Sequence, residues 1–387
     1  MDSPIRDILV KKFNDVYERN PFVTAYAPGR VEILGNHTDY NEGFVLSAAI
    51  NFGTFFGVAP RTDDRVRLTA GDLMKTVEFP VGDPAPTKED SWSNYVKGVI
   101  AGLSAHGRVG GFDALFYGNI PLGSGLSSSA ALEMSAALAI AKLFELSVPP
   151  VELAKIGQTA EREYAGCNCG LLDQASSLFG KKDSLVRSDF RTLSFDTLSI
   201  GHDVCFLLFK THARHALVDG AYNERREACE RAAKYFAGVL PHPVTALRDV
   251  SWKEWSDHRD GLDPLTARRA AHPIGEDERV LSAAGLLRDR DLEGFGRLMF
   301  ESHDSSRFNF ENSCPELDTI VDAAKATPGV LGARLTGGGF GGSVVALVRP
   351  DDAEAVKRDI GTAYAAKYGT RCDSRAIVCS DGARVLD

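Results

Sequence analysis

The ten residues Pro121-Leu-Gly-Ser-Gly-Leu-Ser-Ser-Ser-Ala130 directly precede a segment, 130–144, that is rich in Ala and Leu and carries two charges. This composition predicts a nearly buried helix. Gly123 and Gly125 permit close backbone approach to a ligand, and the first turn of a helix has unpaired N–H groups. With three consecutive serine hydroxyls added, the stretch favours a phosphate-binding loop over a merely capped helix start. No GxxxxGK[ST] pattern is present, so a nucleotide would be held differently from one in a Walker loop.

A second glycine-rich stretch, Gly337–Gly342, formally contains the pattern GxGxxG. A dinucleotide-binding fingerprint follows a strand and opens a helix, whereas the next residues, Ser343–Val348, form an apolar run typical of a strand. A dehydrogenase is therefore disfavoured. Because glycines let the backbone approach a ligand closely, we slightly favour a loop wrapped around a ligand over a flexible hairpin.

Two further stretches place polar side chains between apolar segments. Residues 27–30 and 35–41 bring Arg, Asn, His and Asp together around the apolar run 31–34, which suggests carbohydrate or phosphate contacts. Residues 170–174, GLLDQ, place an acid beside two leucines, where burial or a nearby cation would decide its protonation state. A single buried Asp is often structural, so this stretch alone leaves both interpretations open.

Local periodicity predicts a mixed α/β protein whose first third is rich in strands. The predicted strands are 31–34, 44–50, 66–69, 75–79, 112–117, a hairpin over 187–198, 204–210, 332–336 and 344–348. The predicted helices are 92–103, 130–144, 153–165, 222–236, 316–326 and 353–368. We place a domain break near residues 199–204, which gives domains 1–200 and 204–387.

Composition excludes several classes of protein. With 387 residues, 44% hydrophobic and 25% charged, the chain is globular, and no apolar run approaches the roughly 18 residues of a membrane span. The start lacks a signal-peptide pattern, so we expect a cytoplasmic protein. The net charge of −9 argues against a nucleic-acid partner. Seven cysteines without a CxxC pair suit a reducing compartment, and we interpret Cys167 and Cys169 as small buried thiols.

Together these stretches resemble the galactokinases of the GHMP kinase superfamily, and the match spans nearly the whole chain. Five blocks occur in the family's order: GRVEILGNHTDYNEGFVL (29–46), PLGSGLSSSAALE (121–133), GCNCGLLDQ (166–174), AYNERREACE (221–230) and RLTGGGFGGSVVALV (334–348). The resemblance implies a two-domain α/β fold (α+β type). Its N-terminal domain is of ribosomal-protein-S5 type, its C-terminal domain is ferredoxin-like, and the active site lies in the cleft between them.

The implied reaction transfers the γ-phosphoryl group of ATP to the anomeric hydroxyl of galactose, with Mg²⁺ as the metal. Asp173 matches the family's catalytic acidic residue, whose carboxylate accepts the proton of the sugar hydroxyl or orients that hydroxyl. Arg30 matches the catalytic arginine. Ser128 and Glu161 match the positions associated with magnesium, and a hydroxyl with a carboxylate suits a hard ion. The implied ATP-binding residues are Gly123, Ser124, Gly125, Leu126, Ser127, Ser128, Ser129, Gly338 and Gly339.

The resemblance assigns the sugar to Asn36, His37, Asp39, Gly170 and Tyr222. One departure concerns Asn36, where the family usually has the Glu that contacts the sugar's 6-hydroxyl. The loss of that negative charge removes the repulsion against a 6-carboxylate, so galacturonate becomes an admissible substrate. We favour galactose as the substrate. Glu32 and Ser47, where Asn and Pro are typical, are interpreted as packing variants.

Alternative functions are a kinase for galacturonate or N-acetylgalactosamine, another GHMP kinase, or a non-catalytic galactose and ATP sensor. Sensors of that type have a shortened serine motif, whereas GLSSSA is complete here. The HTDYN stretch argues against acceptors that are not sugars. We expect small-molecule partners only, with neither nucleic acid nor membrane, and the family allows a monomer.

Overall fold

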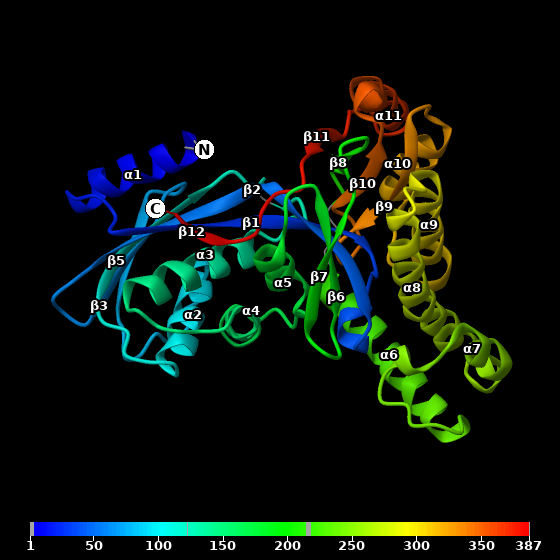
Figure 1. Cartoon of the computed structure of the whole chain (residues 1–387), viewed down its shortest axis with the longest axis horizontal. Helices are drawn as coiled ribbons and strands as arrows, with labels where there is room; N and C mark the ends of the chain where they lie inside the picture. The colour runs from blue at the N-terminus through cyan, green and yellow to red at the C-terminus, as the bar shows by residue number, and fades with distance from the viewer. Residues whose placement is uncertain (1–3, 122, 214–217, 387) are drawn as a thin grey trace.

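The computed structural model describes residues 4–121, 123–213 and 218–386, and in these residues the chain forms an eight-stranded and a four-stranded sheet (Figure 1). The larger sheet has the order β12-β1-β2-β5-β3-β4, and the β6–β7 hairpin pairs with the start of β2. Only β3 and β5 are parallel within this described sheet. Its strands are β1 (Val23–Leu34), β2 (Phe44–Pro60), β3 (Arg65–Ala70), β4 (Lys75–Pro80), β5 (Phe112–Gly118), β6 (Ser184–Asp189), β7 (Ser194–Ser199) and β12 (Arg384–Leu386).

Helices lie on both faces of the larger sheet, with α1 on one side and α2, α3 and α4 on the other (Figure 1). α3 packs against β1 and β2. Every side chain from Ala130 to Ala137 is buried, which confirms the nearly buried helix predicted over 130–144. The helices are α1 (Pro4–Tyr17), α2 (Asn94–Ser104), α3 (Ser128–Leu143), α4 (Pro150–Thr159) and α5 (Leu172–Phe179).

The smaller sheet is antiparallel, in the order β11-β8-β10-β9. Its strands are β8 (Cys205–Lys210), β9 (Val330–Thr336), β10 (Ser343–Val348) and β11 (Asp373–Ile377). The helices of this half of the chain are α6 (Val218–Val239), α7 (Trp252–His258), α8 (Pro264–Arg288), α9 (Leu292–Ser305), α10 (Pro315–Ala326) and α11 (Ala353–Tyr368). α9, α10 and α11 pack on the smaller sheet, whereas α6 and α7 pack on α8. Short 3₁₀ turns cover Asp39–Asn41, Ser91–Ser93, Leu247–Asp249, Arg259–Gly261 and Pro350–Asp352, and π-helical turns cover Ala160–Tyr164 and Ser306–Phe310.

One hydrophobic cluster contains residues of both sheets, which explains why β8 is apolar from Cys205 to Phe209. Successive side chains of a strand point to opposite faces. Leu207 and Phe209 pack toward α10 and α11, whereas Phe206 and Leu208 pack toward α8, α9 and the end of β1. Val31 of β1 belongs to that second cluster. The end of β1 is therefore packed against residues of both sheets, which positions the segment that follows it.

Most predicted elements are confirmed, with two informative differences. Residues 153–165, predicted as one helix, are α-helical only to Thr159 and continue as the π-helical turn Ala160–Tyr164. The last strand, β12, returns to the larger sheet and pairs with β1, for example Ala25 with Val385. The chain changes sheets between β7 and β8, and the limits 1–200 and 204–387 stay a prediction.

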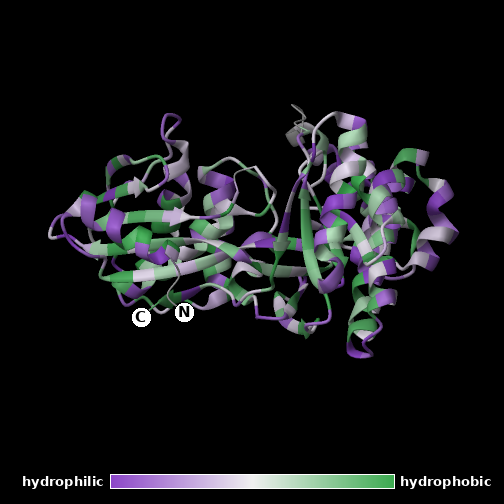
Figure 2. Ribbon diagram, turned by 90° about the horizontal axis from the view of Figure 1, so that it is seen from above, coloured by the Kyte–Doolittle hydropathy of each residue, from purple (hydrophilic) through white to green (hydrophobic). Residues whose placement is uncertain are grey.

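Hydrophobic residues concentrate on the strands, and hydrophilic residues are more frequent on the outlying helices (Figure 2). Across the described part of the chain, no helix combines the length and the apolar character that crossing a membrane requires.

Candidate active site

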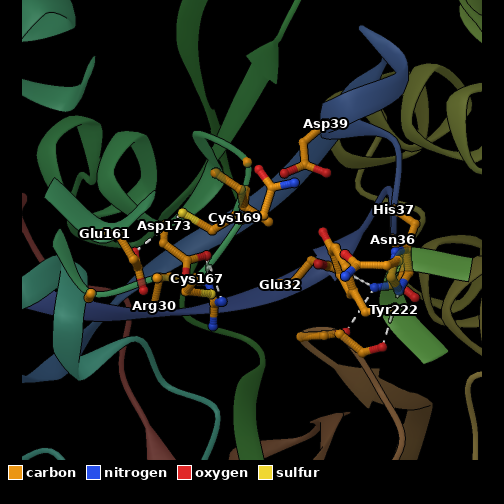
Figure 3. A pocket seen from close by; sticks show the side chains of 18 residues that line it. Arg30, Glu32, Asn36, His37, Asp39, Glu161, Cys167, Cys169, Asp173 and Tyr222 are labelled. Carbon is orange, nitrogen blue, oxygen red and sulfur yellow. Dashed lines mark hydrogen bonds and ion pairs between the residues drawn. The ribbon is translucent and has the colours of Figure 1, made fainter. Parts of the chain in front are cut away.

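Two cavities adjoin where β1, α5 and the loop between β9 and β10 meet. The inner cavity, of about 500 Å³, is lined by β1, the turn after it, the segment 161–173 and α6 (Figure 3). The loop cavity, of about 480 Å³, is lined mainly by residues 120–121, 123–129 and 336–342. Arg30, Asp173, Gly337 and Gly338 line both cavities.

The predicted sugar-binding and ATP-binding residues divide between these cavities by role, whereas the two predicted metal positions, Glu161 and Ser128, line different cavities. The inner cavity is lined by Asn36, His37, Asp39, Gly170, Tyr222 and Glu161. The loop cavity is lined by Gly123, Ser124, Gly125, Leu126, Ser127, Ser128, Ser129, Gly338 and Gly339. Arg30 and Asp173 lie at the junction. The chain therefore brings the predicted sugar, ATP and catalytic positions into one continuous site.

Arg30 and Asp173 form an ion pair at this junction. Arg30 projects from β1, and its Nε and Nη2 lie 2.7 and 2.6 Å from Asp173 Oδ1. The Nη1 atom donates to the carbonyl of Gly125 at 2.6 Å, which ties the pair to the serine-rich loop. The second carboxylate oxygen, Oδ2, accepts a hydrogen bond from Ser127 Oγ. Arg30 thus connects the carboxylate with the loop expected to hold phosphate.

Left-handed backbone conformations shape the serine-rich loop. Gly123 and Gly125 have φ of +64° and +71°, which favour glycine, and Ser127 adopts φ +57° just before α3. Ser343 Oγ of β10 donates to the carbonyl of Ser124 at 2.9 Å and anchors the loop to the smaller sheet. Ser128 is exposed at the start of α3, and its hydroxyl donates to no atom among the described residues. That hydroxyl and the helix N-terminus are available to an anion.

The glycine loop between β9 and β10 closes the other side of the loop cavity. Gly339 has φ +83°, and a Cβ atom there would lie 2.2 Å from the carbonyl oxygen of Asn312. Glycine is therefore required for the loop to lie this close to Asn312. As predicted, strands flank the loop on both sides, which confirms that it is not a dinucleotide-binding turn.

His37 is held as a neutral imidazole in the wall of the inner cavity. Its Nε2 lies 3.1 Å from the carbonyl of Gly338 and its Nδ1 lies 2.8 Å from Tyr40 Oη. These partners assign the proton to Nε2, because a carbonyl can only accept. Burial lowers the pKa of His37 to about 4. The imidazole also packs against Tyr222, with ring centroids 5.0 Å apart.

Asp39 and Gly170 lie in contact with each other in the wall of the inner cavity. A Cβ atom on Gly170 would lie 1.6 Å from Asp39 Oδ2, so only glycine leaves room for this carboxylate. Burial raises the pKa of Asp39 to about 6, and the nearby Asp173 acts in the same direction. Asp39 therefore offers carboxylate oxygens to a ligand from a site that is partly shielded from water.

An acidic cluster lies beside the junction. Burial is the main cause that raises the pKa of both Glu161 and Glu133, and charge repulsion between carboxylates adds to it. The amide nitrogen of Gln174 donates to both glutamates, at 2.8 Å to Glu133 and 2.9 Å to Glu161. Ser129 Oγ donates to Glu161 Oε1 at 2.8 Å. A divalent cation near Glu161 would offset this repulsion.

The donor set fits magnesium bound together with phosphates. Within residues 4–121, 123–213 and 218–386, no three His, Cys, Asp or Glu side chains converge into a metal cage. Mg²⁺ in phosphoryl-transfer enzymes is usually held by one or two side chains, waters and substrate phosphates, so a cage is not required. Glu161 in the inner cavity and Ser128 in the loop cavity are donor types that would suit such a partial set.

Several partners of the predicted residue Asn36 went unrecognised in the sequence. Asn36 is buried in a network with Glu32, Asn312, Gly337 and Glu276. Glu32 lines the inner cavity, so its interpretation as a packing variant is wrong. A signal did exist, since Arg30 and Glu32 are two residues apart on one strand and share a face. Ser47 is indeed buried, with its Oγ 2.7 Å from that of Ser176.

The cysteine interpretation also needs correction. Cys167 is exposed and Cys169 is partly buried, and both line the inner cavity, so they are not buried structural thiols. The turn 166–170 follows the π-helical segment, and its backbone lies along the cavity rather than in the core.

Comparisons with known proteins agree with this geometry. Residues 11–60 match the galactokinase galactose-binding signature, residues 94–181 the GHMP kinases N terminal domain, and residues 283–366 the GHMP kinases C terminal domain. The crystal structure of Lactococcus lactis galactokinase complexed with galactose is 33% identical, with a TM-score of 0.93 over 99% of this chain and 100% of that chain.

More distant structures share the fold alone. Methanococcus jannaschii mevalonate kinase is 18% identical, with a TM-score of 0.66 over 92% of this chain and 98% of that one. A D-glycero-D-manno-heptose 1-phosphate kinase from Bacteriodes thetaiotaomicron is 16% identical, with a TM-score of 0.62 over 95% and 99%. The predicted two-domain GHMP kinase fold is confirmed. With a full-length match at 33% identity and the galactokinase signature, the chain belongs to the galactokinase family of the GHMP kinases.

Proposed function

We propose that this protein is an ATP-dependent sugar kinase that phosphorylates the anomeric hydroxyl of galactose. The products would be galactose 1-phosphate and ADP. The observation that carries the proposal is the Arg30–Asp173 ion pair at the junction of the two cavities. A sugar in the inner cavity would present a hydroxyl there to a phosphoryl donor in the loop cavity.

Asp173 orients the reacting hydroxyl and accepts its proton. The anomeric oxygen forms a bond to the γ-phosphorus, the bond from that phosphorus to the bridging oxygen breaks, and its electron pair leaves with ADP. Oδ1 of Asp173 is held by Arg30, so Oδ2 is the oxygen free to exchange its partner, Ser127, for the sugar hydroxyl. Arg30 stabilises charge on the transferring group while it keeps this carboxylate in place.

The loop cavity accepts the triphosphate through backbone groups and hydroxyls. Ser128 lies at the start of α3, where the first N–H groups of the helix are unpaired. Phosphate oxygens bind well to such helix starts and to glycine loops. Gly338 and Gly339 contribute backbone from the opposite wall.

Magnesium would be held by Glu161 and Ser128 together with the phosphates. When bound, the ion neutralises phosphate charge during transfer. Ser129 and Gln174 donate hydrogen bonds to Glu161 and hold its side chain in one orientation. The carboxylate would therefore lose little conformational freedom when the ion binds. The free Ser128 hydroxyl supplies a neutral oxygen ligand.

Galactose is favoured over galacturonate because the inner cavity retains its acids. Asp39 and Glu32 both line the cavity, so a 6-carboxylate would meet negative charge despite the amide at Asn36. We also propose that the chain acts as a monomer, because every predicted site residue comes from one chain. Sedimentation at several protein concentrations would test the monomer.

Purified protein should be tested for ADP release from ATP with galactose, galacturonate, N-acetylgalactosamine, glucose and no sugar, with and without Mg²⁺. We expect turnover with galactose that depends on the metal. Phosphorus NMR of the product should show a phosphate on the anomeric carbon. Sugar binding without turnover would favour a sensor, and a faster reaction with another sugar would change the substrate.

A further inference from the structure

The side chain of Asn36, which the family resemblance assigns to the sugar's 6-hydroxyl, is already fully engaged. Its amide nitrogen donates to Glu32 Oε1 at 2.8 Å and to the carbonyl of Gly337 at 2.9 Å. Its carbonyl oxygen accepts from Asn312 Nδ2 at 2.8 Å. An amide group has two N–H donors, and both are used here. Asn36 is only 1% exposed, so it has little surface left for a ligand.

Glu32 has the opposite character, because half of its carboxyl group is unused. Oε1 accepts from Asn36 and from Arg334 Nη1, the latter at 3.1 Å. Oε2 accepts no hydrogen bond from residues 4–121, 123–213 and 218–386. Unlike Glu133 Oε1, which also has no partner there, it is not fully enclosed by the protein. It therefore keeps accessible surface. Because Glu32 lines the inner cavity, that surface belongs to the cavity.

The position of Glu32 suits contact with a bound sugar. Its side chain lies between the Arg30–Asp173 pair on one side and Asn36 and His37 on the other (Figure 3). Arg30 and Glu32 are on the same face of β1, two residues apart. A sugar whose reacting hydroxyl lies at Asp173 would therefore reach over Glu32 with the rest of its ring.

We infer that Glu32, held by Asn36 and Arg334, is the specificity-determining residue that accepts the hydrogen bond of the sugar's 6-hydroxyl. This inference rests on the proposed function. Residues 32 and 36 have in effect exchanged roles relative to the family pattern, in which Asn is typical at 32 and Glu at 36. Their direct contact makes the exchange physically simple, since one carboxyl and one amide are kept at one place.

Charge balance in the network supports a carboxylate at position 32. Arg334 is fully buried, and its other carboxylate neighbour, Glu276 at 3.8 Å, also binds Arg279. Glu276 further accepts the backbone N–H groups of Gly35 and Asn36, at 2.7 and 2.9 Å. Glu32 thus supplies the charge that compensates Arg334, although burial raises the pKa of Glu32 to about 7. A 6-carboxylate on the substrate would repel that charge.

The test compares galactose with 6-deoxygalactose, which lacks the 6-hydroxyl. For each variant we would measure kcat/KM with both sugars and, independently of turnover, the Kd of both sugars by calorimetry. The wild-type protein should prefer galactose strongly, because a site built to bind a hydroxyl rejects the analogue without it. Glu32→Gln should lower kcat/KM for galactose by about 10- to 100-fold, the loss expected for a hydrogen bond to a charged group. Its value for 6-deoxygalactose should change little, so the ratio collapses.

Asp277→Asn is a matched control, because Asp277 is also a buried carboxyl whose pKa burial raises to about 7. It accepts the backbone N–H of Phe44 at 2.6 Å and does not line the inner cavity. This variant should leave the sugar ratio unchanged. The exchange variant Glu32→Asn/Asn36→Glu keeps the total charge and should recover the ratio to within about tenfold of the wild type, because a carboxylate again faces the 6-hydroxyl.

An unchanged sugar ratio in a folded Glu32→Gln protein would overturn the inference. If that variant does not fold, Glu32→Asp is the deciding variant. It keeps a negative charge to compensate Arg334, but its shorter side chain withdraws the carboxylate from the cavity. An unchanged sugar ratio in Glu32→Asp would also overturn the inference. Suppose that the wild-type protein binds galactose more tightly than 6-deoxygalactose but shows no turnover, and that Glu32→Gln makes the two Kd values equal. The proposed function would then be wrong, and the inference about Glu32 would stand. Wild-type protein that binds neither sugar would overturn both.

Discussion

Arg30 binds Asp173 through one carboxylate oxygen, since its Nε and Nη2 lie 2.7 and 2.6 Å from Oδ1, whereas Oδ2 accepts a hydrogen bond from Ser127. The arrangement separates two tasks within one carboxylate. Oδ1 fixes the group against β1, and Oδ2 faces the junction of the two cavities with a partner that can be exchanged.

Replacing Asp173 by Asn should abolish turnover while ATP and sugar binding persist. The amide keeps the shape of the carboxylate but cannot accept the hydroxyl proton, and we expect kcat to fall by at least about 10³-fold. Steady-state ADP release measures this. Asp196→Asn is the control, since Asp196 forms an exposed pair with Arg187 on the β6–β7 hairpin. Near-normal turnover in Asp173→Asn would remove this residue from the chemistry.

Gly170→Ala should weaken sugar binding more than it slows catalysis. The new Cβ would lie 1.6 Å from Asp39 Oδ2, so the carboxylate has to move away. We expect KM for galactose to rise about 10- to 100-fold, the effect of one misplaced charged hydrogen bond. Gly238→Ala in α6, where nothing lies within 4 Å of a new Cβ, should leave KM unchanged. An unaltered KM in both variants would place Asp39 outside the sugar site.

The pH dependence of kcat/KM should show an acidic limb between about pH 6 and 7. Burial raises the pKa of Asp39 to about 6 and that of Glu32 to about 7, and protonation of either removes a carboxylate acceptor for the sugar. His37, with its pKa lowered to about 4, stays neutral throughout. A profile that is flat down to pH 5 would contradict these assignments.

The free energy of unfolding should depend on pH in the opposite direction from kcat/KM at Asp39. A folded-state pKa above the unfolded value means that the folded state binds the proton more tightly, so this contribution to stability is lost as the pH rises through about 6. Asp39→Asn should therefore raise the melting temperature relative to the wild type more at pH 8 than at pH 4. Calorimetry at both values provides the comparison, and an equal difference at both would refute the sign.

Glu161→Gln should raise the Mg²⁺ concentration needed for half-maximal velocity about tenfold or more. Gln can still accept from Ser129, so the local fold is kept while the charge facing the ion is lost. The stabilisation of the protein by ADP with Mg²⁺, beyond that by ADP alone, should shrink in parallel. Glu152→Gln, a partly exposed position on α4 paired with Lys155, is the control. An unchanged magnesium requirement would exclude Glu161 as a ligand.

Much of the fold could be predicted from local sequence. The helix over 130–144, the hairpin over 187–198 and the strand over 204–210 each follow from the spacing of apolar residues, and each is present as α3, β6–β7 and β8. The π-helical turn at Ala160–Tyr164 was missed, since apolar periodicity does not distinguish a helix from one that widens in its last turn. β12 was missed because a three-residue strand has too short a pattern to detect.

The candidate site divides in the same way. The serine-rich loop and the glycine loop are continuous in sequence, and their glycines allow the positive φ angles seen in both, so the sequence by itself predicted them as candidate ligand-binding loops. Arg30 and Asp173 are 143 positions apart, and Asn36 lies 301 positions from Gly337 and 276 from Asn312. Which side chains meet across such separations depends on strand register and on packing between the sheets, and no local pattern encodes these. Only the tertiary structure therefore decided that Asn36 is fully occupied and that Glu32 faces the cavity.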